Sequence, residues 1–405
     1  MNTSLTRWKE AATLILAAGR QLVAGSQSSG SLQKAASASP LADSGCAVSH
    51  LLHSSFDYEV LLLKRSGKSR FMPSAYVFPG GVVDASDFSS EWLDIFSSFK
   101  NVSDFGLRSI EQAPDSRPPI FATNRMKLGS PIPGEVAFRI CALRETFEES
   151  GVLLVLSKME EESLLESLKD RRYNDQALPC QTNVLSSSEL TKWRALVNQN
   201  PSNFIRMCRE LEVLPNIWAL HEWSNWLTPA GKYGGTRFDT AFFICCLQEA
   251  PHTLQDQREI VHYQWSTPSE VLQSSQAQEL WIPPPQFYEF SRLCRFPLLS
   301  DLHVFASQRA IKGCEHWLPV VFLKDDHYIS LLPGDKLYPL DGSEDIQVDT
   351  GTDSQLDKPE EEPALHRILV MSSNSLALQI TIQPKYDHVL PVIMPPLSHD
   401  PQSRL

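Results

Sequence analysis

The sequence of residues 134–156 predicts a helix, a glycine that ends it, and a strand directly after it. Apolar side chains recur at helical spacing from Val136 to Phe147, which predicts an amphipathic helix. Gly151 follows directly and is a natural left-handed cap for such a helix, and the next five residues, VLLVL, are typical of a buried strand. The last turn of the helix therefore faces a loop junction, the kind of place where ligands usually bind.

That last turn carries three glutamates. Glu145, Glu148 and Glu149 lie three and four residues apart and so share one face of the helix. Such a pattern is most often a solvated acidic face, and a repulsion of roughly a few tenths of a kcal/mol per pair does not by itself require a cation. The junction favours a metal site instead, because Mg²⁺ and Mn²⁺ prefer carboxylate oxygens and usually reach a site together with substrate phosphates. The neighbouring Arg144 can hold one carboxylate by a bidentate contact; its alternative role is a surface ion pair of little value.

Composition narrows the classes of protein to which the chain can belong. With 405 residues, 42% of them hydrophobic, the chain can bury one large core or two. A formal net charge of -12, without a run of Lys and Arg, argues against the binding of long nucleic acid. The 8 cysteines show no zinc spacing and no CxxC, which indicates reduced thiols. The apolar run at residues 11–18 is far shorter than the roughly 20 residues of a membrane span, and it predicts a buried strand.

Two strands are expected before the glutamate helix. Residues 25–44, rich in Ser, Ala and Gly, predict a flexible loop between strands. The apolar and branched content of residues 58–64 predicts one strand. A second strand at residues 75–83 is broken by Pro79 and the double glycine after it, where a turn is expected.

The remaining segments read as insertions, strands and helices. Insertions are indicated at residues 84–133 and 158–211, strands at 218–227, 237–247 and 259–265, a helix from 268, an amphipathic helix within 281–305, and β-rich segments at 317–332 and 367–384.

The segment RETFEESGV, residues 144–152, resembles the second half of the sequence pattern of Nudix hydrolases at every fixed position. That half reads R-E-U-x-E-E-x-G-U, with U an apolar residue, and Thr146 is a weak match to U. The glycine that begins the family pattern resembles Gly81, which lies so far before Arg144 that a long insertion must separate the two halves. The early glutamate of the pattern is missing, because Val136 occupies its place and Glu135 lies one position off.

A second motif resembles the pattern of Nudix enzymes that act on coenzyme A. It runs from LLLKRS, residues 61–66, to FPGG, residues 78–81, with Leu63 and Ser74 in place of the family's Thr and Gly. The resemblance implies that substrate binds at Arg65, Arg70, Phe78, Gly80 and Gly81. The two arginines offer forked donors for phosphate oxygens, and the glycines let backbone approach a ligand closely. Without the resemblance, both arginines would be taken for ordinary surface residues.

The family resemblance implies the fold and the organisation of the chain. An α/β/α sandwich around a mixed sheet is expected over residues 8–300, with the long insertions already named. A β-rich C-terminal extension is expected at residues 301–395, either as a small appended unit or as part of the main sheet.

The resemblance also implies a reaction. Glu145 and Glu149 would hold Mg²⁺ or Mn²⁺, Glu148 would serve as ligand or base, and Arg144 and Gly151 would orient this segment. The substrate would be coenzyme A or acyl-coenzyme A, hydrolysed at its diphosphate to adenosine 3′,5′-bisphosphate and free or acylated 4′-phosphopantetheine.

A further base is expected outside the glutamate helix. The candidate is Glu259, whose alternative is a polar residue at the start of a strand.

Two other functions remain open from the sequence. One is hydrolysis of another dinucleotide, such as NADH or a capped RNA end. The other is a Nudix-like binding module without turnover, which the missing early glutamate and the long insertion suggest. The intact Glu145, Glu148 and Glu149 argue against that second function. The oligomeric state is left open.

The last three residues, Ser403, Arg404 and Leu405, are similar to the Ser-Lys-Leu address that a peroxisomal import receptor reads. We therefore expect a peroxisomal location, with residues 396–405 forming a flexible tail that leaves the address accessible.

A competing interpretation places a mitochondrial or secretory leader at the N-terminus. Arg7, Lys9 and Arg20 flank the apolar run at residues 11–18 as basic residues of a leader would. Glu10 disfavours this interpretation, because transit peptides are poor in acidic residues.

Overall fold

The computed structural model describes residues 8–20, 55–169, 185–229, 236–255, 259–324, 327–339, 347–348, 363–372 and 375–394. The predicted loop at residues 25–44 and the predicted tail at 396–405 lie outside these residues. No helix in the described part of the chain is both long enough and apolar enough to cross a membrane.

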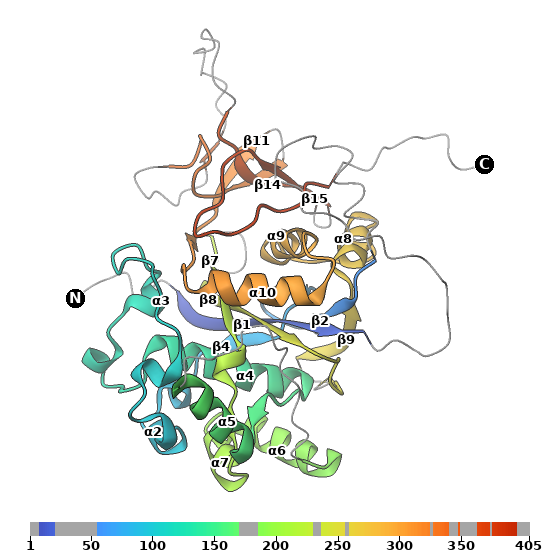
Figure 1. The fold of residues 1–405 in the computed structure, drawn as a ribbon. Helices are drawn as coiled ribbons and strands as arrows, with labels where there is room; N and C mark the ends of the chain where they lie inside the picture. Colours follow the sequence, from blue (N-terminus) through green and yellow to red (C-terminus); the bar gives the residue numbers. More distant parts are fainter. Residues whose placement is uncertain are drawn as a thin grey trace, which may run out of the picture.

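A mixed sheet built on β1 (Lys9–Gly19) forms the centre of the molecule (Figure 1). The order is β10-β7-β8-β1-β2-β3, and β4 also pairs with β1 and β9 with β2. β8 lies parallel to β1, whereas β2 and β4 lie antiparallel to it. The other strands are β2 (Tyr58–Arg65), β3 (Tyr76–Val77), β4 (Gly80–Val82), β7 (His221–Leu227), β8 (Phe238–Leu247), β9 (Ile260–Ser266) and β10 (His316–Trp317).

β1 is buried on both faces, as the apolar run at residues 11–18 predicts. Successive side chains of a strand point to opposite faces, so the strand serves two cores. Leu14 and Leu16 pack in the core that contains α4 (Gly134–Ser150). Ile15 and Ala17 pack in the core of the other face, which contains α8 (Pro268–Gln276), α9 (Pro284–Leu293) and α10 (Leu299–Ala310). The expected α/β/α sandwich is confirmed.

The first predicted insertion, residues 84–133, is packed rather than irregular throughout. It contains short helices whose aromatic side chains Trp92, Phe96 and Phe99 are buried in the core on the α4 side. They are η2 (Ala85–Phe88), α2 (Trp92–Ile95), η3 (Ser97–Phe99), η4 (Ser103–Gly106), α3 (Pro119–Ala122) and η5 (Arg125–Leu128).

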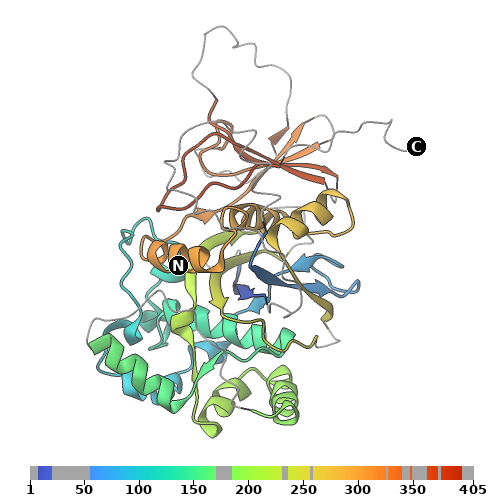
Figure 2. The ribbon, with the colours of Figure 1, turned by 45° about the vertical axis from the view of Figure 1, so that its right-hand side comes forward.

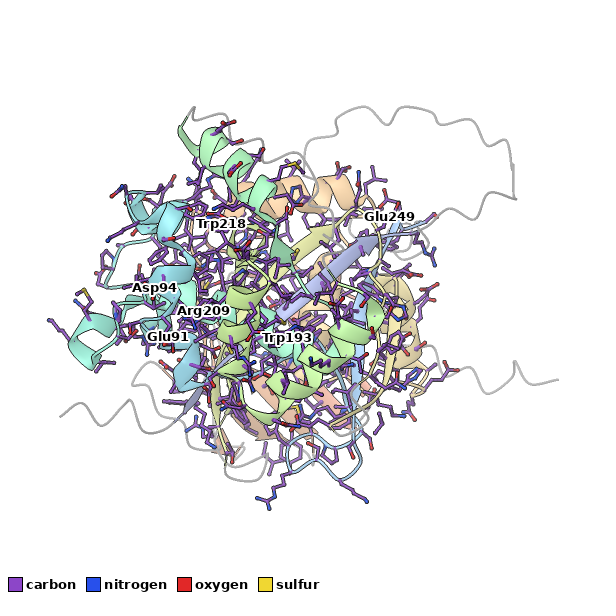
Figure 3. The ribbon with its side chains drawn as sticks, turned by 90° about the horizontal axis from the view of Figure 1, so that it is seen from below. Glu91, Asp94, Trp193, Arg209, Trp218 and Glu249 are labelled. Carbon is purple, nitrogen blue, oxygen red and sulfur yellow. The ribbon has the colours of Figure 1, made fainter. Side chains whose placement is uncertain are left out.

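The second predicted insertion is helical, as its composition indicates. Its described part forms α5 (Lys158–Lys169), α6 (Ser187–Gln199) and α7 (Asn203–Glu210) beneath α4 (Figures 1 and 2). Seen from below, Arg209 of α7 lies beside Glu91 of the first insertion, and their side chains form an ion pair of 2.7 Å (Figure 3). The two insertions therefore contact each other.

The strand predicted at residues 152–156 is wrong in its extent. Only β5 (Val155–Leu156) is a strand, and it pairs with β6 (Leu214–Pro215) in a separate two-stranded sheet. Val152 to Leu154 are buried by packing, which explains their apolar character without pairing in the main sheet.

The C-terminal β-rich segments form a second sheet of five strands in the order β13-β11-β12-β14-β15. It lies beyond α8 and α9, on the side of the molecule away from α4 (Figures 1 and 2). Its strands are β11 (Val320–Lys324), β12 (His327–Leu331), β13 (Gln347–Val348), β14 (His366–Ser372) and β15 (Ser375–Ile380).

The expected boundary near residue 300 falls inside α10. α10 packs on the main sheet, and β10 joins that sheet beside β7. The single amphipathic helix expected within residues 281–305 is in fact two helices, α9 and α10.

The cysteines in the described part of the chain are buried and unpaired, as the sequence indicates. They are Cys141, Cys208, Cys245, Cys246, Cys294 and Cys314.

Candidate active site

The FPGG segment brings backbone against the glutamate helix. Pro79 lacks an N–H and separates β3, which pairs with β2, from β4, which pairs with β1. The turn predicted at the double glycine is wrong, since Gly80 and Gly81 both lie in β4. The predicted strand at residues 75–83 is therefore interrupted at Pro79, one residue before the double glycine where the turn is expected.

Both glycines are required by close approaches. At φ +156°, Gly80 sits so near β1 that a Cβ atom would lie 2.5 Å from the carbonyl oxygen of Ala12. A Cβ atom on Gly81 would overlap the carboxylate of Glu145. The Gly80 N–H donates a hydrogen bond of 2.9 Å to Oε2 of Glu149. The glycines thus admit two carboxylates of α4 beside β4.

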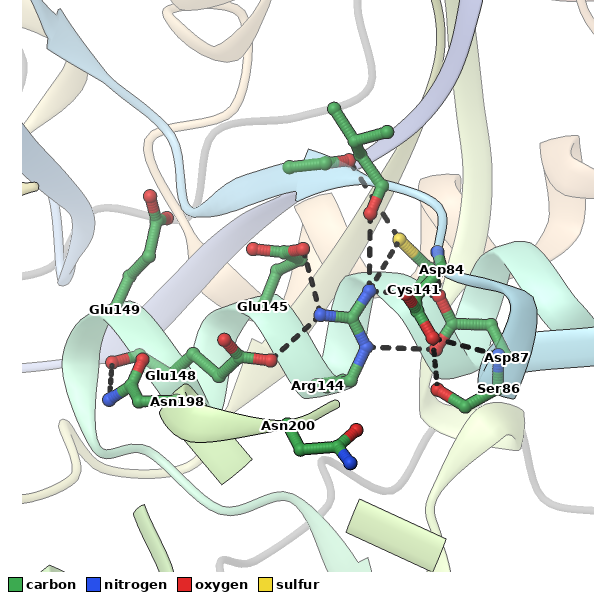
Figure 4. A network of polar contacts seen from close by, with 12 residues as sticks. Asp84, Ser86, Asp87, Cys141, Arg144, Glu145, Glu148, Glu149, Asn198 and Asn200 are labelled. Atoms are coloured by element: carbon green, nitrogen blue, oxygen red, sulfur yellow. Dashed lines mark hydrogen bonds and ion pairs between the residues drawn. The ribbon is translucent and has the colours of Figure 1, made fainter. Parts of the chain in front are cut away.

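The C-terminal end of α4 is fixed in two ways. Gly151 adopts φ +73° and its N–H donates to the carbonyl of Phe147, which confirms the predicted left-handed cap. From α6, Arg194 donates through Nε at 2.9 Å to the backbone carbonyl of Glu148. Asn198 of the same helix approaches that carbonyl (Figure 4). The second insertion therefore anchors the helix end that carries the glutamates.

Arg144 is the centre of the polar network in Figure 4. Its side chain is 2% exposed, so the alternative of a surface ion pair is wrong. Its bidentate contact goes to Asp87, through Nε and Nη2 at 2.8 Å each. Nη1 donates to Glu145 at 2.8 Å and to Glu148 at 2.7 Å. Arg144 thus orients two of the three glutamates.

Asp87 belongs to none of the motifs that the sequence shows. It lies in η2 at the third position after Asp84, and the two aspartates form a capping box with hydrogen bonds of 2.8 and 2.9 Å. The spacing Asp-x-x-Asp after a strand signals such a cap. Its partnership with Arg144 joins residues far apart in sequence and gives no local signal.

Burial dominates the electrostatics of the three glutamates. It raises the pKa of Glu145 to about 7, against the lowering effect of Arg144. Burial likewise raises the pKa of Glu148, again opposed by Arg144. The pKa of Glu149 lies well above its usual range because of burial and the nearby charge of Glu145. Negative charge on this face is therefore costly unless a cation arrives to compensate it.

The donor set suits a hard divalent cation. Among the described residues, no three His, Cys, Asp or Glu side chains form a ready-made metal cluster. Mg²⁺ does not require one, because it commonly binds through one or two carboxylates and completes its shell with water and substrate phosphates. Glu145 and Glu149 are two such carboxylates, buried close enough for each charge to act on the other.

A cavity of about 700 Å³ opens at this face. Its acidic end is lined by Asp84, Glu145, Glu148, Glu149 and Glu259. The rest of the cavity is bounded mainly by aromatic, aliphatic and proline side chains, among them Phe78. It passes the end of β7 and the starts of β8 and β1 on its way to the C-terminal sheet.

Of the two arginines of the coenzyme A motif, only Arg65 lines the cavity. Arg65 lines the cavity, and hydrogen bonds from Nε to the carbonyl of Phe71 at 3.1 Å and from Nη2 to Oγ of Ser69 at 3.0 Å hold its guanidinium. Arg70 is exposed and does not line the cavity. A phosphate role is therefore better supported for Arg65 than for Arg70.

Glu259 lies at the rim of the same cavity, just before β9. Its side chain is exposed, and its charge contributes to the raised pKa values of Glu148 and Glu149. Glu135 lies at the opposite end of α4 and pairs with Arg117 at 2.6 Å. The structure thus brings Glu259 to the site and keeps Glu135 away from it.

Comparison with known proteins gives matches along most of the chain. A model described as the NUDT19 Nudix domain matches residues 8–293, and one described as the NUDT19 C-terminal domain matches residues 321–381. A Gallus gallus protein named acyl-coenzyme A diphosphatase NUDT19 is 44% identical over 415 residues, covering 100% of both chains. The Xenopus laevis protein of that name is 43% identical over 97% of each chain. The Homo sapiens protein is 42% identical over 82% of this chain and 86% of its own.

Proposed function

This chain belongs to the Nudix hydrolase family and is an enzyme, and from that premise we propose that it hydrolyses the diphosphate bond of coenzyme A and acyl-coenzyme A. The products would be adenosine 3′,5′-bisphosphate and free or acylated 4′-phosphopantetheine. One observation supports this substrate above all: the glutamates of α4 line one end of a cavity that is otherwise mainly apolar. A substrate with a diphosphate and a long uncharged arm matches both parts. The names of the relatives from Gallus gallus and Xenopus laevis agree with this choice.

The cation belongs to the proposal. Glu145 and Glu149 would hold Mg²⁺ or Mn²⁺. When bound, the ion neutralises charge on the diphosphate and lowers the pKa of water.

The chain's own residues supply the rest of the mechanism. Arg144 fixes Glu145 and Glu148 through its hydrogen bonds, so their carboxylates are positioned before substrate arrives. Glu148 and Glu259 are the candidates to accept a proton from the attacking water, because both line the acidic end of the cavity. Arg65 offers a guanidinium to a phosphate oxygen from the cavity wall.

The alternatives differ in observable ways. Hydrolysis of NADH would require the mainly apolar part of the cavity to take a second polar nucleoside with its ribose hydroxyls. A binding module would bind a nucleotide without product formation, and the carboxylates at positions 145, 148 and 149 argue against it.

The decisive experiment incubates purified protein and Mg²⁺ with coenzyme A, acyl-coenzyme A, NADH and ADP-ribose, and resolves the products by mass. Adenosine 3′,5′-bisphosphate from the first two substrates is expected. Preferential cleavage of NADH would replace the proposal with its first alternative, and binding without products would replace it with the second.

Metal binding is tested separately from activity. Mg²⁺ or Mn²⁺ should raise the melting temperature, because an ion that binds only the folded state stabilises it. The shift should be absent in Glu149→Gln, and an equal shift in both proteins would place the cation elsewhere.

The proposal extends to location in the peroxisome. It is supported by the similarity of the sequence Ser403, Arg404, Leu405 to a peroxisomal address read by an import receptor. These residues lie outside the described part of the chain.

A further inference from the structure

The end of the cavity opposite the glutamates is shared between two sheets. Trp226 and Phe242 contribute from the main sheet, and Val321 and Ile368 contribute from β11 and β14 of the C-terminal sheet. Val321 is 4% exposed. Its neighbour on the same strand, Val320, packs instead in a separate small core with Ile329 and Leu331. The C-terminal sheet therefore presents one face to the cavity and the other to its own core.

The charges at this end exclude a phosphate. Among the described residues that line the cavity, the only cations are Arg65 and Arg144, and both belong to the acidic end. The start of α9 also lines the cavity, and a helix start commonly binds anions through free N–H groups. Here Pro284 and Pro285 occupy the first two helical positions and remove two of those donors. An uncharged group fits this end, whereas the 3′-phosphate of coenzyme A does not.

Gln286 adds a specific polar contact to the apolar surroundings. It follows the two prolines, lines the cavity, and is 7% exposed. Its Oε1 is buried and has no hydrogen-bond partner in the described part of the chain. A buried carbonyl oxygen without a partner costs about 1–3 kcal/mol, which a ligand N–H would recover. The uncharged pantetheine arm carries two amide N–H groups that could donate to this oxygen.

We infer that the end of the cavity bounded by the C-terminal sheet binds the pantetheine arm and the acyl chain, with Gln286 accepting a hydrogen bond from a pantetheine amide and Val321 limiting the chain length. This inference rests on the proposed function. It assigns the C-terminal sheet a part in substrate selection, because its strands form one wall of the acyl pocket.

Chain-length profiles test the role of Val321. In Val321→Phe, kcat/KM for the longest acyl chain that the wild type hydrolyses should fall at least about tenfold, while free coenzyme A changes less than about threefold. Val321→Ala, which cannot overpack the fold, should shift the profile toward longer chains. The matched control Val320→Ala removes the same atoms from the small core behind the strand. It should lower the melting temperature without altering the profile.

Product inhibition tests Gln286. Gln286→Leu should weaken inhibition by 4′-phosphopantetheine about tenfold and leave inhibition by adenosine 3′,5′-bisphosphate unchanged, because only the first product carries the amides.

The outcomes separate this inference from the proposed function. A wild type that does not cleave coenzyme A refutes the proposed function. A wild type that cleaves coenzyme A but no acyl-coenzyme A thioester overturns both the inference and the acyl-coenzyme A part of the proposed function. An unchanged profile in both Val321 variants, or equal effects of Gln286→Leu on both products, overturns the inference alone.

Discussion

Arg144 determines how charge is distributed among the residues of the site. Its guanidinium compensates Asp87, Glu145 and Glu148, all within hydrogen-bonding distance. Glu149 receives a backbone N–H from Gly80 instead and is 4% exposed. Of the three glutamates it is therefore the one that an added cation would stabilise most.

The first prediction concerns this carboxylate. Glu149→Gln should lower turnover by at least about a hundredfold, because the amide removes a metal-ligand charge while keeping the shape and an oxygen for Gly80. Circular dichroism should show an unchanged fold. Glu145→Gln should behave similarly. A large loss of turnover in Glu259→Gln would support a role as base, and little effect would show that Glu259 is only a polar residue at the rim of the cavity. Near-normal turnover in Glu149→Gln would contradict its assignment.

The second prediction separates Arg65 from Arg70. Arg65→Ala should reduce kcat/KM for coenzyme A at least about tenfold, and more than for a side substrate without the 3′-phosphate, because Arg65 lines the cavity. Arg70→Ala is the matched control, since this side chain is exposed and lies outside the lining. Equal losses across substrates in Arg65→Ala would indicate a structural role through Ser69 and Phe71 instead.

The sequence reveals site residues only where spacing along one element carries the information. Glu145, Glu148 and Glu149 share a helix face, so their convergence follows from helical geometry. The partnership of Asp87 with Arg144 depends on how the first insertion folds back onto α4. Gln286 likewise reaches the cavity only through the packing of α9, which no local pattern encodes.

At the level of elements, the junction between β4 and α4 depends on two glycines with different neighbours. A side chain on Gly80 would meet backbone of β1, which cannot move without breaking the sheet. A side chain on Gly81 would meet the end of the Glu145 side chain. A substitution at Gly80 therefore tests stability, and one at Gly81 tests activity.

The third prediction follows from that difference. Gly80→Ala should destabilise the fold by several kcal/mol, because β4 must leave β1 and Glu149 loses its hydrogen bond. Gly81→Ala should melt within a few degrees of the wild type yet lose at least about tenfold in kcat, because Glu145 is displaced from Arg144. Thermal melting and kinetics on both variants provide the measurement. A stable Gly80→Ala protein would show that β1 and β4 are more loosely paired.

Elements are predictable from the sequence where burial and local signals coincide. α4 ends at Ser150, as the glycine cap predicts, and β1 covers the apolar run. The apolar run after α4 shows the limit of such patterns, because burial alone does not decide whether a segment pairs with a strand. The pairing of β5 with β6 depends on the intervening helices.

At the level of the whole molecule, the C-terminal sheet is joined to the Nudix unit through His366. Its Nδ1 donates to the carbonyl of Pro333 at 2.7 Å, and its Nε2 accepts from the hydroxyl of Tyr288 on α9 at 2.9 Å. A carbonyl only accepts, so Nδ1 is the donor, and in the neutral ring Nε2 is then the acceptor.

The fourth prediction concerns location. Deletion of residues 403–405 should leave the activity of the purified protein unchanged and release a fluorescent fusion with a free C-terminus from peroxisomes into the cytosol. A fusion that stays in mitochondria before and after the deletion would favour the N-terminal leader and leave the hydrolase assignment intact.

The last prediction concerns the contribution of His366 to the pH dependence of protein stability. Burial lowers the pKa of His366 to about 4, and the charge of Arg292 adds to that effect against the hydrogen bond to Pro333. In the unfolded chain the pKa is about 6.5, so both states are neutral above that pH and His366 adds no slope there. Between about pH 6.5 and 4 the unfolded chain binds a proton that the folded protein excludes, so stability falls by up to about 1.4 kcal/mol per pH unit.

His366→Gln should therefore be less stable than the wild type at pH 8 but lose less stability on acidification, as measured by urea unfolding at each pH. His252→Gln, which removes an exposed histidine, is the control. If His366→Gln kept the wild-type slope, the proton uptake would belong to other histidines, such as His221, whose pKa burial lowers to about 3.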